Sequence, residues 1–494
     1  MNPAVSLFRR WRSALADRGA FFRGVVTLLS GTLLARVIAV LAIPLLARLY
    51  SPEEFGALAL FTTIAGLVAA VASGRYDMAV VLPAADEEAV HLVLASMLLA
   101  SLVTVVSLIA VWWHGDLIAA AFGSPELAPW LWFSPAVIWT LAAFATLRSW
   151  AARAGRFGVI SRSVVANTLL TALTQLAVAV PRPWLPGGLI VGRVVGQTCQ
   201  SLLLLLGSWA GMRAACTQGV SLRRLGAVMH RYRDFPLFDA GANLLNQASR
   251  ELPVLLLGAF FGPTVLGFYS VGRRMLSLPV ELVGNAVAQA FFPQAAQELA
   301  RGRLAPLTAD VFERLVMVAI TPLLLIAIVT PEIVQVFLGD AWSEATVYVR
   351  WLTVWVLVVF ITAPFAQLFN VLEQQRQRLV YTSLLVAGQV GVLWWAGQAG
   401  DPVQAVALFS VVTACGTLAN YLWLLAKAGV GLGRTLGVLA RQLLLALPFA
   451  GALWAISLAT DSAFGVLSAA ALIGIVFAAL QMPRVLAKTR ASAG

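Results

Sequence analysis

Charged residues are scarce in this sequence. Asp, Glu, Lys and Arg together make up 11% of the 494 residues, whereas hydrophobic residues make up 60%. A soluble domain carries about 25% charged residues, so the chain lacks the polar surface that soluble domains need. Its mean hydropathy is +0.88. This composition excludes a soluble protein and indicates a polytopic integral membrane protein.

Residues typical of catalytic and metal sites are scarce as well. The lysines are Lys427 and Lys488, and neither follows a glycine, so the Gly-Lys-Ser/Thr element of a phosphate-binding P-loop is absent. The cysteines and histidines are scattered without the spacing of a disulfide framework or a zinc site. We therefore expect no catalytic residue, no metal and no organic cofactor, and a transporter rather than an enzyme.

Long apolar segments fill most of the sequence. A membrane-spanning helix needs about 20 mostly apolar residues, and we find about 14 segments that meet this need. The predicted spans are 24–48, 56–73, 90–113, 127–149, 158–180, 187–210, 235–259, 264–288, 308–330, 345–368, 378–398, 402–427, 435–459 and 463–482. No loop between them is long enough to form a soluble domain.

The basic residues indicate how the spans are oriented. Cytoplasmic loops of membrane proteins are enriched in Lys and Arg. With the N-terminus inside, the basic clusters fall on inner segments, and the outer loops hold only Arg48 and Arg182. Both termini are therefore predicted to be cytoplasmic. Most of the net charge of +12 then reflects topology, so we expect no nucleic-acid partner.

Two halves of the chain resemble each other. A shift of 211 positions superposes Tyr50-Ser51-Pro52 on Phe261-Gly262-Pro263, and Gly56 on Gly267. One interpretation is a duplicated unit of six helices, and the alternative is chance similarity between apolar segments. Because six is even, both copies would enter the membrane from the same side, and a pseudo-two-fold axis would run along the membrane normal.

The duplication predicts an all-α membrane protein with two six-helix lobes and two extra C-terminal helices. The predicted parts are a basic cytoplasmic segment 1–23, an N-terminal lobe 24–211, a basic cytoplasmic linker 212–234, a C-terminal lobe 235–427, and the last two helices with a cytoplasmic tail, 428–494.

Polar side chains form stripes within several predicted spans. Arg36 is the midpoint of 24–48, and Thr32 precedes it by one helical turn. Span 235–259 carries Asp239, Asn243, Asn246 and Arg250 at spacings of 4, 3 and 4 residues, with Gln247 beside them. Span 264–288 carries Arg273, Ser277, Glu281 and Asn285 four residues apart, with Arg274 adjacent. Such spacings place side chains on one helical face.

These stripes predict a hydrated, cationic cavity, because unpaired polar groups are too costly to face lipid. In the alternative interpretation, Arg250 or Arg273 pairs with Glu251 or Glu281 only to hold helices together. The arginines outnumber the neighbouring carboxylates, however, and a surplus of guanidinium groups favours an anionic ligand. Phosphate fits best, because the planar guanidinium pairs with its oxygens through two hydrogen bonds.

Two groups of short motifs resemble a known family. They are Leu49-Tyr50-Ser51-Pro52-Glu53-Glu54-Phe55-Gly56 with Gly74-Arg75-Tyr76-Asp77, and Gly267-Phe268-Tyr269-Ser270 with Arg273, Pro279 and Phe291-Phe292-Pro293. They are similar to the start of each half in Wzx-type polysaccharide and O-unit flippases. These belong to the MOP (multidrug/oligosaccharidyl-lipid/polysaccharide) exporter superfamily, together with lipid II flippases and MATE drug exporters.

The resemblance implies transport of an undecaprenyl-pyrophosphate-linked oligosaccharide across the bacterial inner membrane, by alternating access. It implies that cavity arginines correspond to Arg36, Arg250 and Arg273, with Arg274 beside them, and that Arg75 lies at the cytoplasmic gate. Asp239 and Glu281 are the candidates for coupling to protons or sodium ions. Partners would be the lipid-linked substrate and other membrane proteins of polysaccharide assembly.

Three alternatives stay open at this point. A lipid II flippase also binds a pyrophosphate in a cationic cavity. A MATE-like solute exporter would carry drug cations and would need an acidic cavity. A membrane polymerase or ligase would carry a large outer loop with catalytic side chains, which this sequence does not contain.

Overall fold

Helices account for nearly all of the described chain. The computed structural model describes residues 3–179, 187–216, 219 and 221–491. Side chains are described for these residues except 3–22, 25, 278, 279, 281, 282, 285 and 482–491. Within these ranges the backbone forms helices and turns and no β-strand. The predicted all-α class is therefore confirmed.

The helices form two compact units. Unit 1 comprises Met1–Tyr50 and Ala57–Ala259, and unit 2 comprises Ser51–Gly56 and Phe260–Gly494. This grouping follows which parts of the backbone lie close together, whereas the predicted lobes 24–211 and 235–427 follow the duplication in the sequence. The first half of one long helix thus belongs to unit 1, although it lies beyond the linker 212–234. The duplicated lobes themselves stay a prediction.

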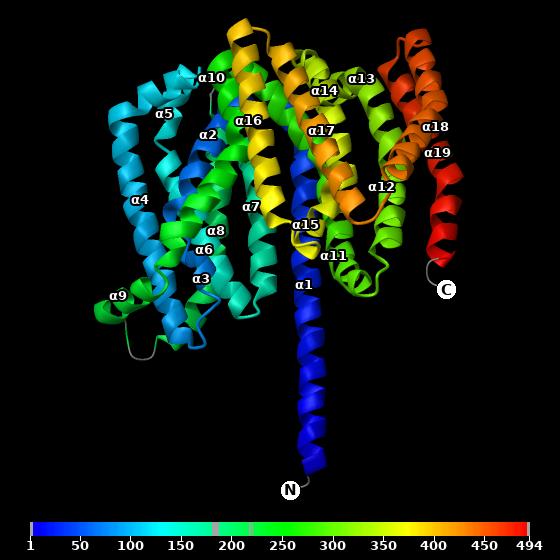
Figure 1. Ribbon diagram of the computed structural model, residues 1–494. Coiled ribbons are helices and arrows are strands. Elements are labelled where there is room, and N and C mark those ends of the chain that lie inside the picture. Colours follow the sequence, from blue (N-terminus) through cyan, green and yellow to red (C-terminus); the bar gives the residue numbers. More distant parts are fainter. Residues whose placement is uncertain (1–2, 180–186, 217–218, 220, 492–494) are drawn as a thin grey trace. The chain divides into compact units, whose positions relative to one another are not determined.

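Unit 1 contains the first helices of the chain, drawn in blue to green in Figure 1. They are α1 (Pro3–Ala47), most of α2 (Pro52–Ala72), α3 (Tyr76–Ala79), α4 (Asp86–Ala121), η1 (Pro125–Leu127), α5 (Ala128–Leu131), α6 (Ser134–Arg153), α7 (Phe157–Ala179), α8 (Gly188–Ala215), α9 (Leu222–Arg231), η2 (Phe235–Asp239) and the first half of α10 (Ala240–Pro279). Its core includes Leu92, Leu147 and Leu204, which are at most 2% exposed.

Unit 2 contains the helices from the second half of α10 onward. They are η3 (Val280–Gly284), α11 (Asn285–Ala300), α12 (Leu304–Ile328), α13 (Thr330–Ile333), η4 (Val334–Leu338), η5 (Asp340–Trp342), α14 (Ala345–Thr362), η6 (Ala363–Gln367), α15 (Leu368–Val371), α16 (Gln375–Ala399), α17 (Pro402–Lys427), α18 (Leu432–Ala459) and α19 (Ala463–Ala491). Phe312, Phe365 and Leu368 lie in its core.

The number of spans differs from the prediction. Among the described residues, 12 helices are long and apolar enough to cross a membrane, or 13 if the bent pair Pro125–Leu131 and Ser134–Arg153 is one span. The predicted spans 235–259 and 264–288 account for the remaining difference, because they lie in one continuous segment, Phe235–Ser277. Gly262 breaks the helical path between them, with a φ of 76° and a ψ of −176°. The count of 14 is therefore not confirmed.

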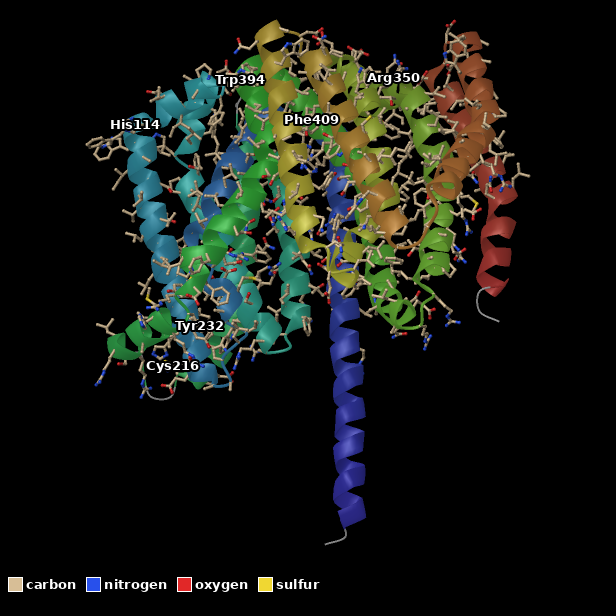
Figure 2. The ribbon with its side chains drawn as sticks, viewed as in Figure 1. His114, Cys216, Tyr232, Arg350, Trp394 and Phe409 are labelled. Carbon is tan, nitrogen blue, oxygen red and sulfur yellow. The ribbon has the colours of Figure 1, made fainter. Side chains whose placement is uncertain are left out.

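A short amphipathic helix lies at one end of unit 1. Leu225 and Val228 of α9 are buried in the core beside α4. Arg231 of α9 forms a 2.8 Å ion pair with Glu88, and Arg224 pairs with Glu87. Figure 2 labels Cys216 and Tyr232 at this end and His114 at the opposite end of α4. Since this end carries many arginines, the predicted topology makes it cytoplasmic.

Candidate functional site

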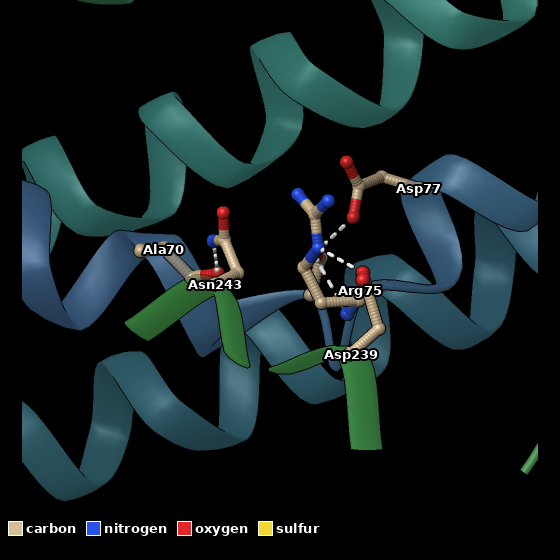
Figure 3. A network of polar contacts seen from close by, with 6 residues as sticks. Ala70, Arg75, Asp77, Asp239 and Asn243 are labelled. Atoms are coloured by element: carbon tan, nitrogen blue, oxygen red, sulfur yellow. Dashed lines mark hydrogen bonds and ion pairs between the residues drawn. The ribbon is translucent and has the colours of Figure 1, made fainter. Parts of the chain in front are cut away.

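An ion pair joins the end of α2 to the start of α10 within unit 1. Arg75 Nε lies 2.7 Å from Asp239 Oδ2 (Figure 3). Arg75 adopts a left-handed backbone conformation with a φ of 59°, directly after Gly74 with a φ of 58°. A left-handed residue other than glycine costs roughly 1–2 kcal/mol, whereas a partly exposed ion pair contributes about 1 kcal/mol or less. Other contacts must therefore hold this turn.

Those contacts come from the residues on either side of Arg75. Ser73 Oγ donates a 2.6 Å hydrogen bond to Asp77 and accepts one from the Arg75 backbone N–H. The Tyr76 hydroxyl donates to the Met229 carbonyl oxygen over 2.9 Å. Burial raises the pKa of the Tyr76 phenol, so this group remains a donor at neutral pH. The turn thus presents Arg75 in a fixed position.

The first half of α10 carries a ladder of polar contacts towards α2. Asn243 Nδ2 donates to the Ala70 carbonyl oxygen over 2.9 Å, as Figure 3 shows. One turn further on, Gln247 Nε2 lies 3.4 Å from Glu251 Oε1, and Thr63 Oγ1 donates to Glu251 Oε2 over 3.3 Å. Asp239, Asn243, Gln247 and Glu251 are four residues apart, so one face of α10 makes all these contacts.

The residues of the predicted stripe therefore differ in their contacts. Asp239 and Asn243 point to α2 and α3, whereas Asn246 and Arg250 are exposed. Sequence reasoning missed Thr63 and did not include Glu251 among the site residues. The four-residue spacing from Asp239 to Glu251 was the signal that could have found Glu251. Thr63 lies on another helix, so no spacing along the sequence connects it with Glu251.

Three of the predicted arginines have no acidic partner among the described side chains. Arg250 and Arg274 are exposed and Arg273 is half-buried, and no described carboxylate lies within ion-pair distance of any of them. The nearby Glu251 is engaged by Thr63 and Gln247 instead. The described side chains therefore do not form the ion pair between Arg250 and Glu251 that the alternative interpretation required.

The remaining predicted site residues lie on α1, α10, η3 and α11. Arg36 is half-buried on α1, where the Thr32 hydroxyl donates to the Leu28 carbonyl oxygen over 2.8 Å. The Ser277 hydroxyl donates to the Arg274 carbonyl oxygen. The side chains of Glu281 and Asn285 lie outside the described residues. The backbone places Glu281 in η3 and Asn285 at the start of α11.

A symmetric contact within unit 2 joins the two motifs that the 211-residue shift relates. A Cβ atom on Gly56 would lie 1.8 Å from the Pro263 carbonyl oxygen, and one on Gly267 would lie 1.9 Å from that of Pro52. Each glycine thus accommodates the proline that precedes the other by four residues. Glycine is required on both sides, because any side chain would collide with backbone.

Polar and aromatic groups surround this glycine–proline contact. The Thr264 hydroxyl donates to Glu53 Oε1 over 2.7 Å, and these residues are again 211 apart. The rings of Phe55 and Phe268 pack against Trp342, with centroid distances of 5.2 and 6.0 Å. Several interactions therefore support this contact. The short motifs around Gly56 and Gly267, which resemble the flippase family, form it.

The chain is similar to known proteins of polysaccharide biosynthesis. The profile of a family described as "Polysaccharide biosynthesis protein" matches residues 45–347. The succinoglycan biosynthesis transport protein ExoT of Rhizobium meliloti (strain 1021) is 23% identical over 390 residues, which cover 78% of this chain and 76% of that protein.

Solved structures share the fold at low sequence identity. The lipid II flippase MurJ in an inward closed conformation superposes with a TM-score of 0.73 and 11% identity, covering 93% of this chain and 100% of that one. An inward-facing MATE family multidrug transporter of the MOP superfamily gives a TM-score of 0.63 and 13% identity, covering 82% and 98%. These likenesses show that the chain has the MOP fold.

Proposed function

Because the chain belongs to the polysaccharide biosynthesis protein family, we propose that it flips an undecaprenyl-pyrophosphate-linked oligosaccharide from the cytoplasmic to the periplasmic leaflet. The protein is a multi-pass membrane transporter of the MOP superfamily. The oligosaccharide would be a repeat unit of O-antigen or exopolysaccharide, and the membrane would be the bacterial inner membrane. Both termini would lie in the cytoplasm.

The observation that carries this proposal is the set of unpaired arginines in spanning helices. Arg250, Arg273 and Arg274 have no described acidic partner, although Glu251 and Asp239 lie on the same helix as Arg250. A charge within the bilayer must face water or protein, because facing lipid costs several kcal/mol. We therefore place these guanidinium groups along a hydrated path, where they offset the desolvation of a diphosphate.

In the proposed cycle, Arg36, Arg250, Arg273 and Arg274 bind the two phosphates. Each charge-assisted hydrogen bond contributes about 1.5–3 kcal/mol, so several are needed to draw a doubly charged headgroup from water. Polar side chains such as Asn246 and Ser277 would line the path of the sugars. The polyprenyl chain would remain in lipid while the headgroup crosses by alternating access.

Asp239 is one of the two candidates for ion coupling, and its side chain is described. Its carboxylate pairs with Arg75 at the inner end of α2, so protonation of Asp239 would release Arg75. Such a step would link a proton to the cytoplasmic gate. The prediction for Asp239→Asn is transport that no longer depends on the proton gradient, measured as surface polysaccharide with and without an uncoupler.

The competing functions fit the charges or the comparisons less well. A drug-cation exporter requires acidic groups in its cavity, whereas the predicted charged site residues without an ion-pair partner among the described side chains are Arg250, Arg273 and Arg274. A lipid II flippase shares the fold and the phosphate chemistry, but the matched family profile and the transport protein of Rhizobium meliloti concern polysaccharides. Complementation of a lipid II flippase deletion would favour that alternative.

A strain that lacks this protein, complemented with the wild type or a variant, tests the proposal. Arg250→Gln and Arg273→Gln should each lower surface polysaccharide at least about tenfold, the effect of losing roughly 1.4 kcal/mol of phosphate binding. Arg434→Gln is the matched control, because Arg434 is exposed on α18 outside the proposed path. Lipid-linked repeat units should accumulate in the inner leaflet. Full activity of both cavity variants, or accumulation of unpolymerised units outside, would contradict the proposal.

A further inference from the structure

The α16–α17 pair in unit 2 contains a groove that the transport cycle does not use. The groove has a volume of about 550 Å³. Figure 1 shows the two helices side by side. Its walls are mainly apolar and partly exposed, with Val380 53% and Leu384 68% exposed. The lining residues are Arg376, Gln377, Val380, Tyr381, Leu384, Leu385, Val412, Gly416, Ala419, Asn420 and Trp423.

One end of the groove is cationic. Arg376 lies in the first turn of α16 and is exposed, with no described carboxylate within ion-pair distance. Trp423 lines the groove near the end of α17, and Lys427 Nζ lies 5.9 Å from the centroid of its ring. Since α16 begins where α17 ends, both cations lie at the same end of the helix pair. An anionic group is expected there.

A polar donor without a partner lies next to this end. Asn420 lines the groove, and its buried Nδ2 atom has no hydrogen-bond partner in the described chain. Leaving a buried donor unsatisfied costs about 1–3 kcal/mol. The neighbouring Tyr381 hydroxyl already donates to Thr417 Oγ1 over 3.2 Å. A ligand with an acceptor oxygen about one helical turn from Trp423 would satisfy Asn420.

The length of the groove matches one leaflet of a bilayer. From Arg376 to Leu385 the wall of α16 rises by about 14 Å, and from Trp423 to Val412 that of α17 spans about 17 Å. The hydrocarbon layer of one leaflet is about 15 Å thick. At about 30 Å³ for a group the size of a water molecule, the groove holds roughly 18 methylene-sized groups.

We propose that this groove binds an anionic phospholipid of the inner leaflet. One fatty acyl chain fills the apolar part, the phosphate contacts Arg376, and an ester carbonyl oxygen accepts from Asn420. The volume favours an acyl chain over the polyprenyl chain of the substrate, which has about three times as many carbon atoms as the groove accommodates. The positive end distinguishes an anionic lipid from a zwitterionic one.

Native mass spectrometry of the full-length protein tests this site. Phosphatidylglycerol should bind more tightly than phosphatidylethanolamine. Arg376→Gln should weaken phosphatidylglycerol binding about fivefold, which is the contribution of one basic residue at an anionic membrane surface. It should weaken phosphatidylethanolamine binding less, because the ammonium group of that lipid offsets the charge of its phosphate. Arg434→Gln, the matched control on α18, should change neither.

Two further variants test the groove and its polar donor. Ala419→Phe should weaken binding of both lipids about tenfold by filling the groove, equivalent to roughly two lost methylene contacts. Ala426→Phe, on the same helix but outside the groove, is its control. Asn420→Leu should weaken both lipids by similar factors, because both carry the ester carbonyl. Thermal unfolding of each variant checks that it is folded.

Three outcomes would overturn the proposal. Equal affinity of the wild type for the two phospholipids would contradict the charge argument. Equal binding by the Ala419→Phe and Ala426→Phe variants would exclude the groove as the site. Displacement of phosphatidylglycerol by equimolar undecaprenyl phosphate would assign the groove to the polyprenyl chain. None of these measurements requires transport, so their failure is distinguishable from failure of the proposed flippase function.

Discussion

The α7–α8 pair of unit 1 and the α16–α17 pair of unit 2 are both antiparallel helix pairs. They differ in how closely the two helices of each pair approach. Along α8, Cβ atoms on Gly192 and Gly196 would lie 2.4 Å from Gln175 and 1.9 Å from Thr171. The backbones therefore approach closely and leave no gap. In α17 a Cβ on Gly416 would meet only the end of the Leu385 side chain, at 2.9 Å.

The hydrogen bonds between the helices also differ between the two pairs. In unit 1, Asn167 Nδ2 donates to Gln200 Oε1 over 2.7 Å, and Gln175 Nε2 donates to the Leu189 carbonyl oxygen over 2.8 Å. In unit 2, Gln389 Nε2 donates to the Thr413 hydroxyl over 3.0 Å, and Asn420 Nδ2 has no hydrogen-bond partner among the described residues. Small residues allow membrane helices to pack by direct contact. Where the glycines of one helix do not meet the backbone of the other, as at Gly416, room remains for lipid.

The largest expected effect is loss of the close α7–α8 contact. Gly196→Leu would force backbone atoms apart, because a Cβ at this position already overlaps Thr171 and the Asn167 carbonyl oxygen. We expect destabilisation of about 3 kcal/mol or more, seen as aggregation in fluorescence-detected size-exclusion chromatography. Gly391→Leu on α16 is the control, because a Cβ there meets no atom within 4 Å. Aggregation of both variants would contradict the comparison.

A smaller effect is expected from the polar contact between α7 and α8. Asn167→Leu leaves the buried Gln200 amide without its donor, which should cost about 1 kcal/mol. The Asn167→Leu, Gln200→Leu double variant should recover part of this loss, and thermal unfolding in detergent measures both. Gln389→Leu in α16 should cost less, because Thr413 can bond to its own helix. Equal losses of stability in Asn167→Leu and Gln389→Leu would contradict the difference between the two helix pairs.

Gly416→Ala and Gly192→Ala should change the unfolding temperature in opposite directions. Alanine favours a helix over glycine by up to about 1 kcal/mol, and at position 416 the new methyl group displaces only the end of Leu385. We expect the unfolding temperature to rise slightly with Gly416→Ala and to fall with Gly192→Ala, where Gln175 and backbone atoms block the methyl group. A fall in both would show that α16 and α17 are as tightly packed as α7 and α8.

The smallest effect concerns the exposed turn between α11 and α12, which gives a baseline for surface contacts. Hydrogen bonds from Arg303 and then Arg301 hold the pKa of Glu298 below its usual range. The pKa is lower in the folded protein than in the unfolded chain, so the stabilisation is present at neutral pH. It is lost as the pH falls through the folded pKa. Glu298→Gln should slightly flatten the acid side of unfolding temperature against pH, and an unchanged profile would contradict this assignment.

Part of the candidate site was predictable because it repeats along one helix. The four-residue spacing that begins with Asp239 and Asn243 reveals a polar face, since helical geometry alone aligns such residues. Spacing could not reveal which neighbours that face meets. Asp239 pairs with Arg75, 164 positions away, and Thr63 contacts Glu251, 188 positions away. These partners depend on how helices pack and leave no local pattern.

The sequence by itself determined the all-helical membrane class, because burial of apolar residues in a bilayer depends on composition and segment length. It also identified the motifs around Gly56 and Gly267. Only the tertiary structure decided that these glycines accommodate each other's prolines, that Asp239 pairs with Arg75, and that α16 and α17 leave a groove beside Arg376. Hydropathy adds up residue by residue along the chain, whereas close packing and charge pairing depend on residues brought together from distant positions.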